Sequence, residues 1–383
     1  MKKIYLDYAA TTPVDKRVLE EMKPYFSEKY GNASSLHSLG TEAKRALEEA
    51  REKVASVIKA NPKEIIFTSS GTESNNTALK GVAFANRDKG KHIITTPIEH
   101  DCVLNSARWL KKQGFDVDFI PVDKYGLVDL EKLEELIRKD TILISVMHAN
   151  NEIGTIEPIK EIGKIAKEHD VYFHTDAAQS YGKIDIDVKK MNIDLITANA
   201  HKIYGPKGVG ALFIREGVKI DPLLHGGGHE FGLRSSTENV AGIVGFGKAA
   251  EIAKKEMRGE SERLIKLRNT LIENILKIDD CWLNGHPDKR LPNNANFSFR
   301  FIEGESLVMY LDMQGICAST GSACSSKSLE PSHVLTAIGL KPEEAHGSLR
   351  LTTGRFTTKE DIDYVIEVLP NVVKNLRKLS PLK

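Results

Sequence analysis

Two polar residues in one stretch of the chain, Asp176 and Lys202, have the types and positions that cofactor chemistry needs. Each follows an apolar run typical of a buried strand, at residues 171–174 and 193–197. In an open α/β sheet, ligands bind outside the carboxyl ends of the strands, so this carboxylate and this amine would face one pocket. Pyridoxal phosphate requires such a pair, because its aldehyde forms a Schiff base with a lysine and its ring nitrogen needs an acidic partner. A salt bridge between strand ends is the alternative interpretation.

A second motif has the features of a phosphate-binding site. A strand-like run at residues 65–68 leads into small polar residues and then into a predicted helix that continues to about Ala85. Free N–H groups at the start of such a helix bind anions, Gly71 permits close approach of the backbone, and the Thr72 hydroxyl is a further donor. Ordinary helix capping would explain the same residues.

Further candidates lie just past other predicted strands. His100 follows a strand at residues 93–95, where its ring could stack on a flat cofactor, although a single histidine there is usually structural. Asn150 and Asn151 follow a strand at residues 141–147. Their side-chain amides could bind a ring oxygen or a carboxylate, or the pair could simply form a turn.

Two residues near the carboxyl terminus could act on a substrate. Arg350 lies in a strand-like run at residues 348–352, and an inward-facing arginine needs an anionic partner, either a substrate carboxylate or a structural one. Cys324 lies among small polar residues at 317–328, where a thiol is expected to be exposed, mobile and reactive. Burial as a small apolar side chain is the alternative, and it suits Cys317.

Composition narrows the class of protein. The 383 residues suffice for two domains. Lys plus Arg number 54 against 53 for Asp plus Glu, and this net charge of +1 gives no reason to expect binding to nucleic acid or to a membrane surface. No apolar run is long enough to span a bilayer and the amino terminus lacks the apolar core of a signal peptide, so we expect a cytoplasmic protein. Four cysteines without a C-x-x-C pair indicate neither a disulfide framework nor structural zinc.

The order of predicted elements indicates the fold class. Strands and helices alternate as far as Lys202, which is typical of a doubly wound, mostly parallel α/β sheet with crossover helices. An antiparallel or edge strand is expected at residues 208–214. A long helix at residues 240–276, with a kink near Gly259, is expected to join two domains.

We predict a large cofactor-binding α/β domain at residues 15–255. Residues 1–14 and 256–383 would form a smaller α+β domain that carries the Cys324 loop. A glycine-rich segment contains His225 and His229, but so flexible a loop offers no scaffold for a metal, and we expect no intrinsic metal site. Its glycines would instead let the loop reach a neighbouring active site.

Taken together, these residues resemble the NifS/IscS cysteine desulfurases of the class V aminotransferase group. The resemblance covers nearly the whole chain and rests on an ordered set of motifs: LDYAATTP, TSSGTESNN, EHDCV, NNEIG, HTDAAQ, HKIYGPKG, GGGHE, GSACSS, SLEPSHVL and GRFTT. Single motifs are weak, but the ordered set is specific. The resemblance implies the type I fold of pyridoxal-phosphate-dependent transferases.

The resemblance also implies a role for each candidate residue. It makes Lys202 the Schiff-base lysine and catalytic base, Asp176 the partner of the pyridine nitrogen, and His100 the ring that stacks on the cofactor. The other implied contacts are Gln179 and Asn151 with the ring oxygen, Asn151 and Arg350 with the substrate carboxylate, Gly71, Thr72, Asn199 and His201 with the phosphate, and Thr237 with the phosphate of the other subunit. Two residues depart from the pattern, because Asn199 replaces a serine and Ser236 a glycine; both leave the chemistry possible.

The implied reaction takes sulfur from L-cysteine to give L-alanine and a persulfide on Cys324. The implied partners are a second copy of the chain, in a homodimer with shared active sites, and an iron–sulfur scaffold protein of the IscU type, with which Cys324 could transiently bind a [2Fe–2S] cluster. Transfer of the sulfur for tRNA thiolation is a second possible destination. A selenocysteine lyase, an ordinary aminotransferase and a non-catalytic sulfur-pathway scaffold are the alternatives, and Lys202 argues against the last of these.

Overall fold

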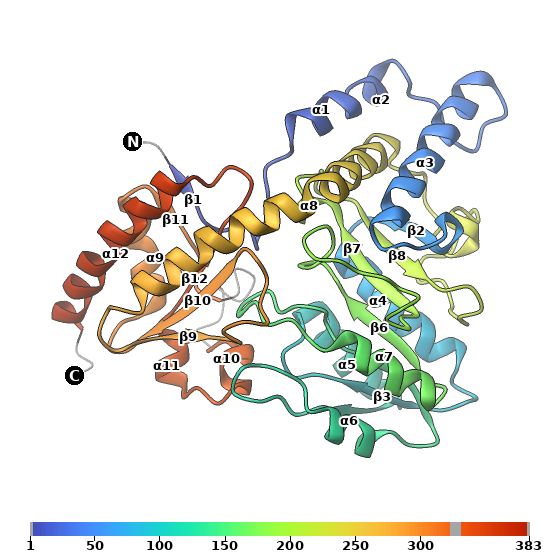
Figure 1. The fold of residues 1–383 in the computed structure, drawn as a ribbon. Helices are drawn as coiled ribbons and strands as arrows, with labels where there is room; N and C mark the ends of the chain where they lie inside the picture. Colours follow the sequence, from blue (N-terminus) through green and yellow to red (C-terminus); the bar gives the residue numbers. More distant parts are fainter. Residues whose placement is uncertain (1–2, 322–330, 381–383) are drawn as a thin grey trace.

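The computed structural model describes residues 3–321 and 331–380, which form two lobes joined by one long helix (Figure 1). The larger lobe contains a seven-stranded sheet between helices, and the smaller lobe contains a three-stranded sheet. This arrangement confirms the predicted α/β class with a mostly parallel sheet.

The large sheet has the strand order β2-β8-β7-β6-β5-β3-β4. In that order the strands are Ile65–Thr68, Gly210–Ile214, Leu195–Asn199, Tyr172–Asp176, Thr141–Ser145, His92–Thr95 and Asp116–Phe119. β8 is antiparallel to both of its neighbours, whereas the pairs from β7 to β4 are parallel. The carboxyl ends of the other strands therefore lie at one edge of the sheet, where ligands bind in such folds.

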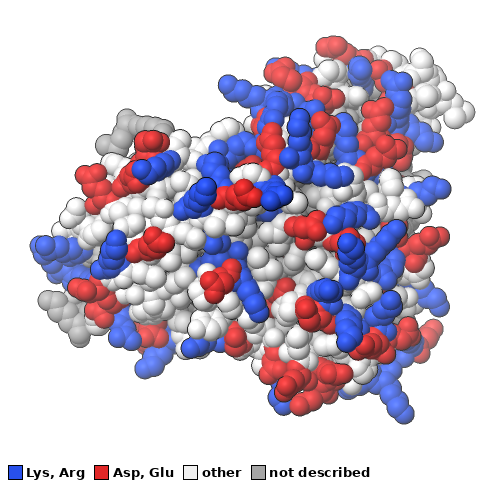
Figure 2. Space-filling model, in the orientation of Figure 1, with Lys and Arg blue, Asp and Glu red and all other residues white. Residues whose placement is uncertain are grey.

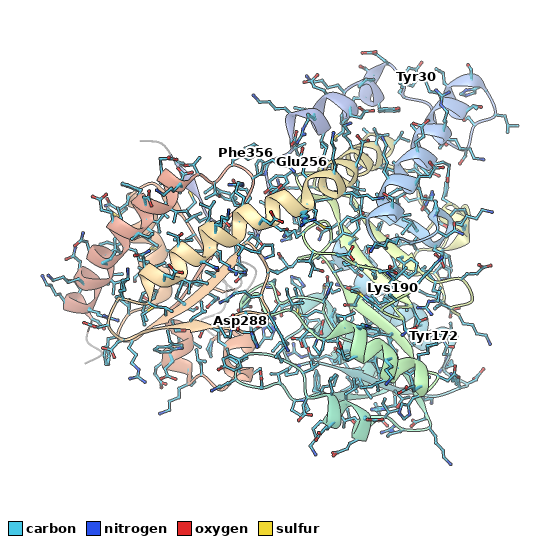
Figure 3. All side chains as sticks on the ribbon, in the orientation of Figure 1. Tyr30, Tyr172, Lys190, Glu256, Asp288 and Phe356 are labelled. Carbon is cyan, nitrogen blue, oxygen red and sulfur yellow. The ribbon has the colours of Figure 1, made fainter. Side chains whose placement is uncertain are left out.

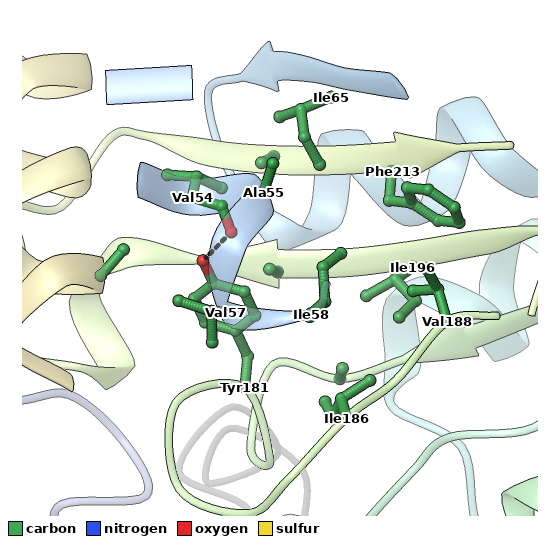
Figure 4. Packing of buried hydrophobic residues seen from close by; sticks show 14 of the residues in the cluster. Val54, Ala55, Val57, Ile58, Ile65, Tyr181, Ile186, Val188, Ile196 and Phe213 are labelled. Carbon is green, nitrogen blue, oxygen red and sulfur yellow. Dashed lines mark hydrogen bonds between the residues drawn. The ribbon is translucent and has the colours of Figure 1, made fainter. Parts of the chain in front are cut away.

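The two faces of the large sheet have separate apolar cores, because side chains alternate along each strand. Phe67 belongs to one core and its neighbour Ile66 to the other. The first core includes residues of α3 (Ser38–Val57), α7 (Ile159–Glu168) and α8 (Val240–Ile275), and the second includes residues of α4 (Gly71–Ala85) and α5 (Asp101–Lys112). Figure 4 shows part of the first core, in which the hydroxyl of buried Tyr181 donates to the carbonyl oxygen of Val54 at 2.8 Å.

Helix α8 connects the two lobes. A Cβ on Gly247 would lie 2.7 Å from the Cα of Ala50, so this glycine lets α8 pack closely on α3. Further along, Leu271 contributes to the core of the smaller lobe. At Gly259, near which the sequence predicted a kink, α8 continues as one helix.

The smaller lobe combines both ends of the chain. Its antiparallel sheet has the order β12-β10-β9, and β1 pairs in parallel with β11. These strands are Ser348–Thr352, Asn294–Phe299, Cys281–Asn284, Ile4–Tyr5 and Ile316–Cys317, and the helices of this lobe are α9 (Gly304–Met313), α10 (His333–Ala337), α11 (Pro342–His346) and α12 (Lys359–Leu379). Short helices α1 (Lys16–Met22), α2 (Pro24–Ser27) and α6 (Leu130–Leu136) belong to the larger lobe (Figure 1).

The domain boundaries predicted from the sequence remain a proposal, which the separation of the apolar cores supports. The first core of the large sheet ends along the chain at Ala253, and the core of the smaller lobe combines Ile4 and Leu6 with residues from Leu271 onward.

Two predicted strands extend further than expected. β6 and β7 end two residues later than the predicted runs 171–174 and 193–197, so that Asp176 is the last residue of β6. The backbone ladder explains the extension of β7, since Asn199 pairs with Gly210 of β8. β8 is antiparallel, as expected, but it lies between two strands and is not an edge.

Positive and negative side chains intermingle over the face shown in Figure 2, as the balanced composition predicts. Within residues 3–321 and 331–380, none of the helices combines the length and the apolar character needed to cross a membrane.

Candidate active site

The candidate site lies at the carboxyl edge of the large sheet. Asp176 ends β6, Asn199 ends β7, and Lys202 follows in a short 3₁₀ turn. The residue pair Asp176 and Thr197 is in register between β6 and β7, so the acid and the lysine follow adjacent strands. Gly71 opens α4 just after β2.

Asp176 is a buried acid held by two donors. Its side chain accepts a hydrogen bond of 2.7 Å from Nδ2 of Asn75 and one of 2.8 Å from the backbone N–H of Ala178. The residue is 6 % exposed. Both oxygens are thus oriented at the strand end, where a ring N–H could become a third donor.

The N-terminal segment, residues 7–12, brings several candidates together. Nζ of Lys202 donates to the carbonyl oxygens of Ala9 and, at 2.8 Å, of Ala10. Nε2 of Gln179 donates to the same Ala9 oxygen at 3.0 Å. Lys202 and Gln179 therefore meet at one carbonyl. The sequence analysis includes this segment only in the motif LDYAATTP, because nothing local indicates such distant contacts.

His201 is anchored to the same segment. Its Nδ1 lies 3.2 Å from the hydroxyl oxygen of Thr11, and its carbonyl oxygen accepts hydrogen bonds from the N–H and hydroxyl of Thr12. Burial, together with the nearby charges of Lys202 and Lys207, lowers the pKa of His201 to about 4. The ring is therefore neutral at neutral pH and can present one N–H donor.

The start of α4 leaves anion-binding groups available. Ser70 caps the helix by accepting from the N–H of Glu73 at 3.1 Å, whereas the N–H groups of Gly71 and Thr72 have no acceptor among the described residues. A Cβ on Gly71 would lie 3.1 Å from Nδ2 of Asn199, so glycine keeps this space open. Oδ1 of Asn199 is buried and has no partner in the described part of the chain. The two N–H groups, with Nδ2 of Asn199 as a further donor, would suit a phosphate, whereas Oδ1 of Asn199 can only accept.

His100 is the N-cap residue of α5 and is partly buried. The preceding residue, Glu99, is a buried acid to which sequence reasoning gave no role. Burial raises the pKa of Glu99 to about 8, although Thr96 and the Met147 N–H both donate to its Oε1. Only the motif EHDCV pointed to this position, and a motif does not reveal burial.

Arg350 is an inward-facing residue of β12 and is 2 % exposed. Its Nη2 donates to Oδ1 of Asp7 at 3.0 Å, and its Nη1 donates to the carbonyl oxygen of Asn151 at 2.9 Å. The structure thus brings Arg350 and Asn151 together. It also shows that Asp7 is a structural anionic partner of Arg350, one of the two kinds of partner that the sequence left open. Nε of Arg350 is buried without a partner among the described residues.

Two candidates are not placed with the others. Thr237 is exposed and forms no described contact with the residues at the carboxyl edge, although nearby Arg234 pairs with Glu73 of α4 at 2.8 Å. Cys324 lies outside the described residues. Within the described ranges, 3–321 and 331–380, no three His, Cys, Asp or Glu side chains group as metal ligands, His225 and His229 included.

Lys183 is a buried amine behind the site. It lines a cavity between the lobes together with Lys202, Tyr8 and Glu260. Burial lowers the pKa of Lys183 to about 8, and its Nζ has no hydrogen-bond partner in the described structure. A buried ammonium without a partner destabilises the folded state.

We therefore predict that Lys183→Met stabilises the protein at pH 7, by roughly 3 kcal/mol for a pKa shift of this size. Below the folded pKa of about 8 the penalty is fully present. As the pH rises from there toward the unfolded value, the unfolded state binds more protons and the wild type gains stability. Urea unfolding at pH 7 and pH 10 measures the effect, and the gain should shrink at the higher pH.

The matched control is Lys190→Met, because the Lys190 side chain is 81 % exposed (Figure 3). This variant should change stability by less than about 0.5 kcal/mol at both pH values. If Lys183→Met raises the free energy of unfolding equally at the two pH values, burial of a charged amine is not what destabilises the wild type.

Comparisons with known proteins agree on one family. A family model described as "Aminotransferase class-V" matches residues 4–365. The protein named "Cysteine desulfurase IscS" from Methanosarcina thermophila is 59% identical over 381 residues, which cover 100% of this chain and 94% of that protein. The solved structure "NIFS-LIKE PROTEIN" has a TM-score of 0.92 and 42% identity, covering 98% of this chain and 100% of that chain. The structure "SspA in complex with cysteine" has a TM-score of 0.83 and 42% identity, covering 93% and 100%.

Proposed function

The chain belongs to the class-V aminotransferase family and, within it, to the NifS/IscS cysteine desulfurases, and we propose that it transfers the sulfur of L-cysteine to Cys324 and leaves L-alanine. The observation that carries this proposal is the meeting of Lys202, Gln179 and Arg350 at the N-terminal segment, beside the strand that ends in Asp176.

The residues present fit pyridoxal phosphate as the cofactor. Asp176 offers an oriented carboxylate for the ring N–H, and Gln179 offers an amide. The free N–H groups of Gly71 and Thr72, with Asn199 and neutral His201, would hold the phosphate. When bound, the cofactor supplies an electron sink that makes the substrate Cα proton acidic.

Lys202 would take up that proton. Its Nζ is directed by the Ala9 and Ala10 carbonyl oxygens, and the Gln179 amide donates to the same Ala9 oxygen. His100, on the neighbouring β3–α5 connection, would cover the cofactor ring. The Lys202 amine would act as the general base at the substrate Cα.

Sulfur transfer to Cys324 balances without any other reactant. The Cys324 thiolate attacks the substrate sulfur, an S–S bond forms, and the carbon–sulfur bond of the substrate breaks. The electron pair of that bond stays on the substrate carbon, which takes up one proton, equivalent to the one that the Cys324 thiol lost, and becomes the alanine methyl group. L-cysteine and a thiol thus become L-alanine and a persulfide.

Arg350 would bind the substrate carboxylate, with Asn151 beside it. We predict that Arg350→Gln raises the KM for L-cysteine about 100-fold with a smaller change in kcat, because a buried charged hydrogen-bonding partner is lost. Asp7→Asn removes the structural partner of Arg350 without removing the guanidinium. It should change KM less than about tenfold. Steady-state kinetics of alanine formation measure both.

If Arg350 serves only the ion pair with Asp7, the two variants will lose stability alike and leave KM unchanged. That result would contradict the assignment to the substrate carboxylate. Thermal unfolding of both variants, measured beside the kinetics, separates the two cases.

Two partners follow from the same proposal. Thr237 is exposed, which would suit contact with the phosphate of a second copy in a homodimer. The sulfur on Cys324 would pass to an iron–sulfur scaffold protein of the IscU type or serve tRNA thiolation. Sedimentation of the purified protein tests the first, and transfer of ³⁵S from labelled L-cysteine to a purified scaffold tests the second.

The experiment that tests the proposed function combines a spectrum with product analysis. The purified protein, supplied with pyridoxal phosphate, should show a visible absorbance band that changes when L-cysteine is added. With an added dithiol to reduce the persulfide, it should form alanine and sulfide in equal amounts. Comparing turnover of L-cysteine with turnover of selenocysteine distinguishes a cysteine desulfurase from a selenocysteine lyase. A protein that cannot take up the cofactor would overturn the proposal and favour a non-catalytic scaffold.

A further inference from the structure

A chain of hydrogen bonds joins the two ends of the candidate cofactor site through residues that have no role in the reaction described above. Nδ2 of Asn75 donates to Oδ2 of Asp176 at 2.7 Å and lies 3.1 Å from Sγ of Cys102. The same Sγ lies 3.0 Å from Nδ1 of His100. Asn75 is fully buried, and Cys102 is partly buried.

The direction of each bond can be assigned. The backbone N–H of Cys102 donates to Nδ1 of His100 at 3.2 Å, and a backbone amide cannot accept. Nδ1 must therefore carry a lone pair, and the proton of the neutral ring must be on Nε2. The Cys102 thiol, on the same side, can then only donate its proton to Nδ1.

The orientation of Asn75 agrees with this assignment. An amide oxygen placed 2.7 Å from the Asp176 carboxylate would be repelled, so the amino group must face it. Its second proton then points to Sγ of Cys102, which accepts from Asn75 while donating to His100. Oδ1 of Asn75 is left without a partner in the described structure. Both amide protons are thus used to connect Asp176 with Cys102.

We propose that Cys102 and Asn75 are positioning residues that hold the neutral His100 ring with its proton on Nε2 and link it to Asp176. Histidine is an unusual N-cap residue, and the bond from the Cys102 N–H explains how it fills that position at the start of α5. The tautomer follows from the protein alone. Its consequence, an N–H donor of fixed direction beside the cofactor ring, rests on the proposed function.

The test is ¹⁵N NMR of the full-length protein labelled in its histidine rings, recorded at neutral pH before and after addition of pyridoxal phosphate. His100→Gln identifies the His100 signals among the 12 histidines. Nδ1 of His100 should resonate as an unprotonated nitrogen and Nε2 as a protonated one. In Cys102→Ala the backbone N–H still holds the tautomer, but the Nδ1 signal should shift because its thiol donor is lost. Cys102→Ser, which keeps a donor, should restore the wild-type signals.

Cys281→Ala is the matched control, because it removes a partly buried thiol from β9 in the other lobe. Turnover should fall about fivefold in Cys102→Ala, the effect of losing one neutral hydrogen bond, and should recover in Cys102→Ser. A wild-type ring protonated on Nδ1, or signals unchanged in Cys102→Ala, would overturn the inference even if the desulfurase activity stands. If the tautomer is as expected but the protein does not bind the cofactor, only the proposed function is overturned.

Discussion

Replacing Lys202 with alanine is expected to abolish desulfuration, with a loss of turnover on the order of 10⁴-fold or more. The proposed function gives the amine two roles, since it would anchor the cofactor aldehyde covalently and would take up the substrate Cα proton. Its neighbour His201 is a poor substitute as a base, because burial and nearby lysines lower its pKa to about 4. Alanine formation from L-cysteine and the visible absorbance of the same preparation measure the loss.

Two further variants make the Lys202 result specific. Lys202→Arg keeps the charge but cannot form the covalent link, and it should be as inactive as the alanine variant. Lys207→Ala removes an exposed lysine from the same loop and should stay within about twofold of the wild type. Alanine formation by Lys202→Ala above about one per cent of the wild-type rate would refute the double role.

The sequence predicted the elements that carry local signals. Apolar runs that end in polar residues identified β6 and β7, and the carboxyl-edge rule then predicted that Asp176 and Lys202 would face one pocket. The structure adds that the strands leading to the two residues are neighbours. Strand ends were misplaced because backbone pairing, as between Asn199 and Gly210, continues beyond the apolar side chains. Periodicity reports burial of side chains and not the length of a hydrogen-bonded ladder.

What the sequence could not predict depends on contacts between distant positions. The partner of Arg350 is Asp7, 343 residues away, so the sequence could indicate the need for an anion but not which anion meets it. Asn75 lies within a motif that local reasoning explains by helix capping, and only packing places its amide between Asp176 and Cys102. Burial of Glu99 and Lys183, likewise, arises from tertiary structure and has no local sign.

Replacing Cys324 with alanine is expected to stop sulfur transfer, with turnover reduced on the order of 10³-fold or more, while cofactor binding is retained. Two of the described thiols, Cys281 and Cys317, are poor replacements. Burial raises the pKa of Cys281 to about 12, and burial together with Asp312 raises the pKa of Cys317, so neither supplies much thiolate at neutral pH. Sulfide release and alanine formation should fall together, since the carbon–sulfur bond breaks only when a thiolate takes the sulfur.

The spectrum of Cys324→Ala separates a lost nucleophile from a lost site. The variant should keep the visible band and its change with L-cysteine, because Lys202, Asp176 and Arg350 are intact, and mass spectrometry should find no persulfide on the protein. Cys317→Ala, made beside it, should form the persulfide at the wild-type rate. Should Cys324→Ala go on forming alanine and sulfide, another group must take the sulfur. If the variant instead transfers amino groups between amino and keto acids at the wild-type rate, the alternative function of an ordinary aminotransferase is correct. That reaction needs the lysine but no thiol.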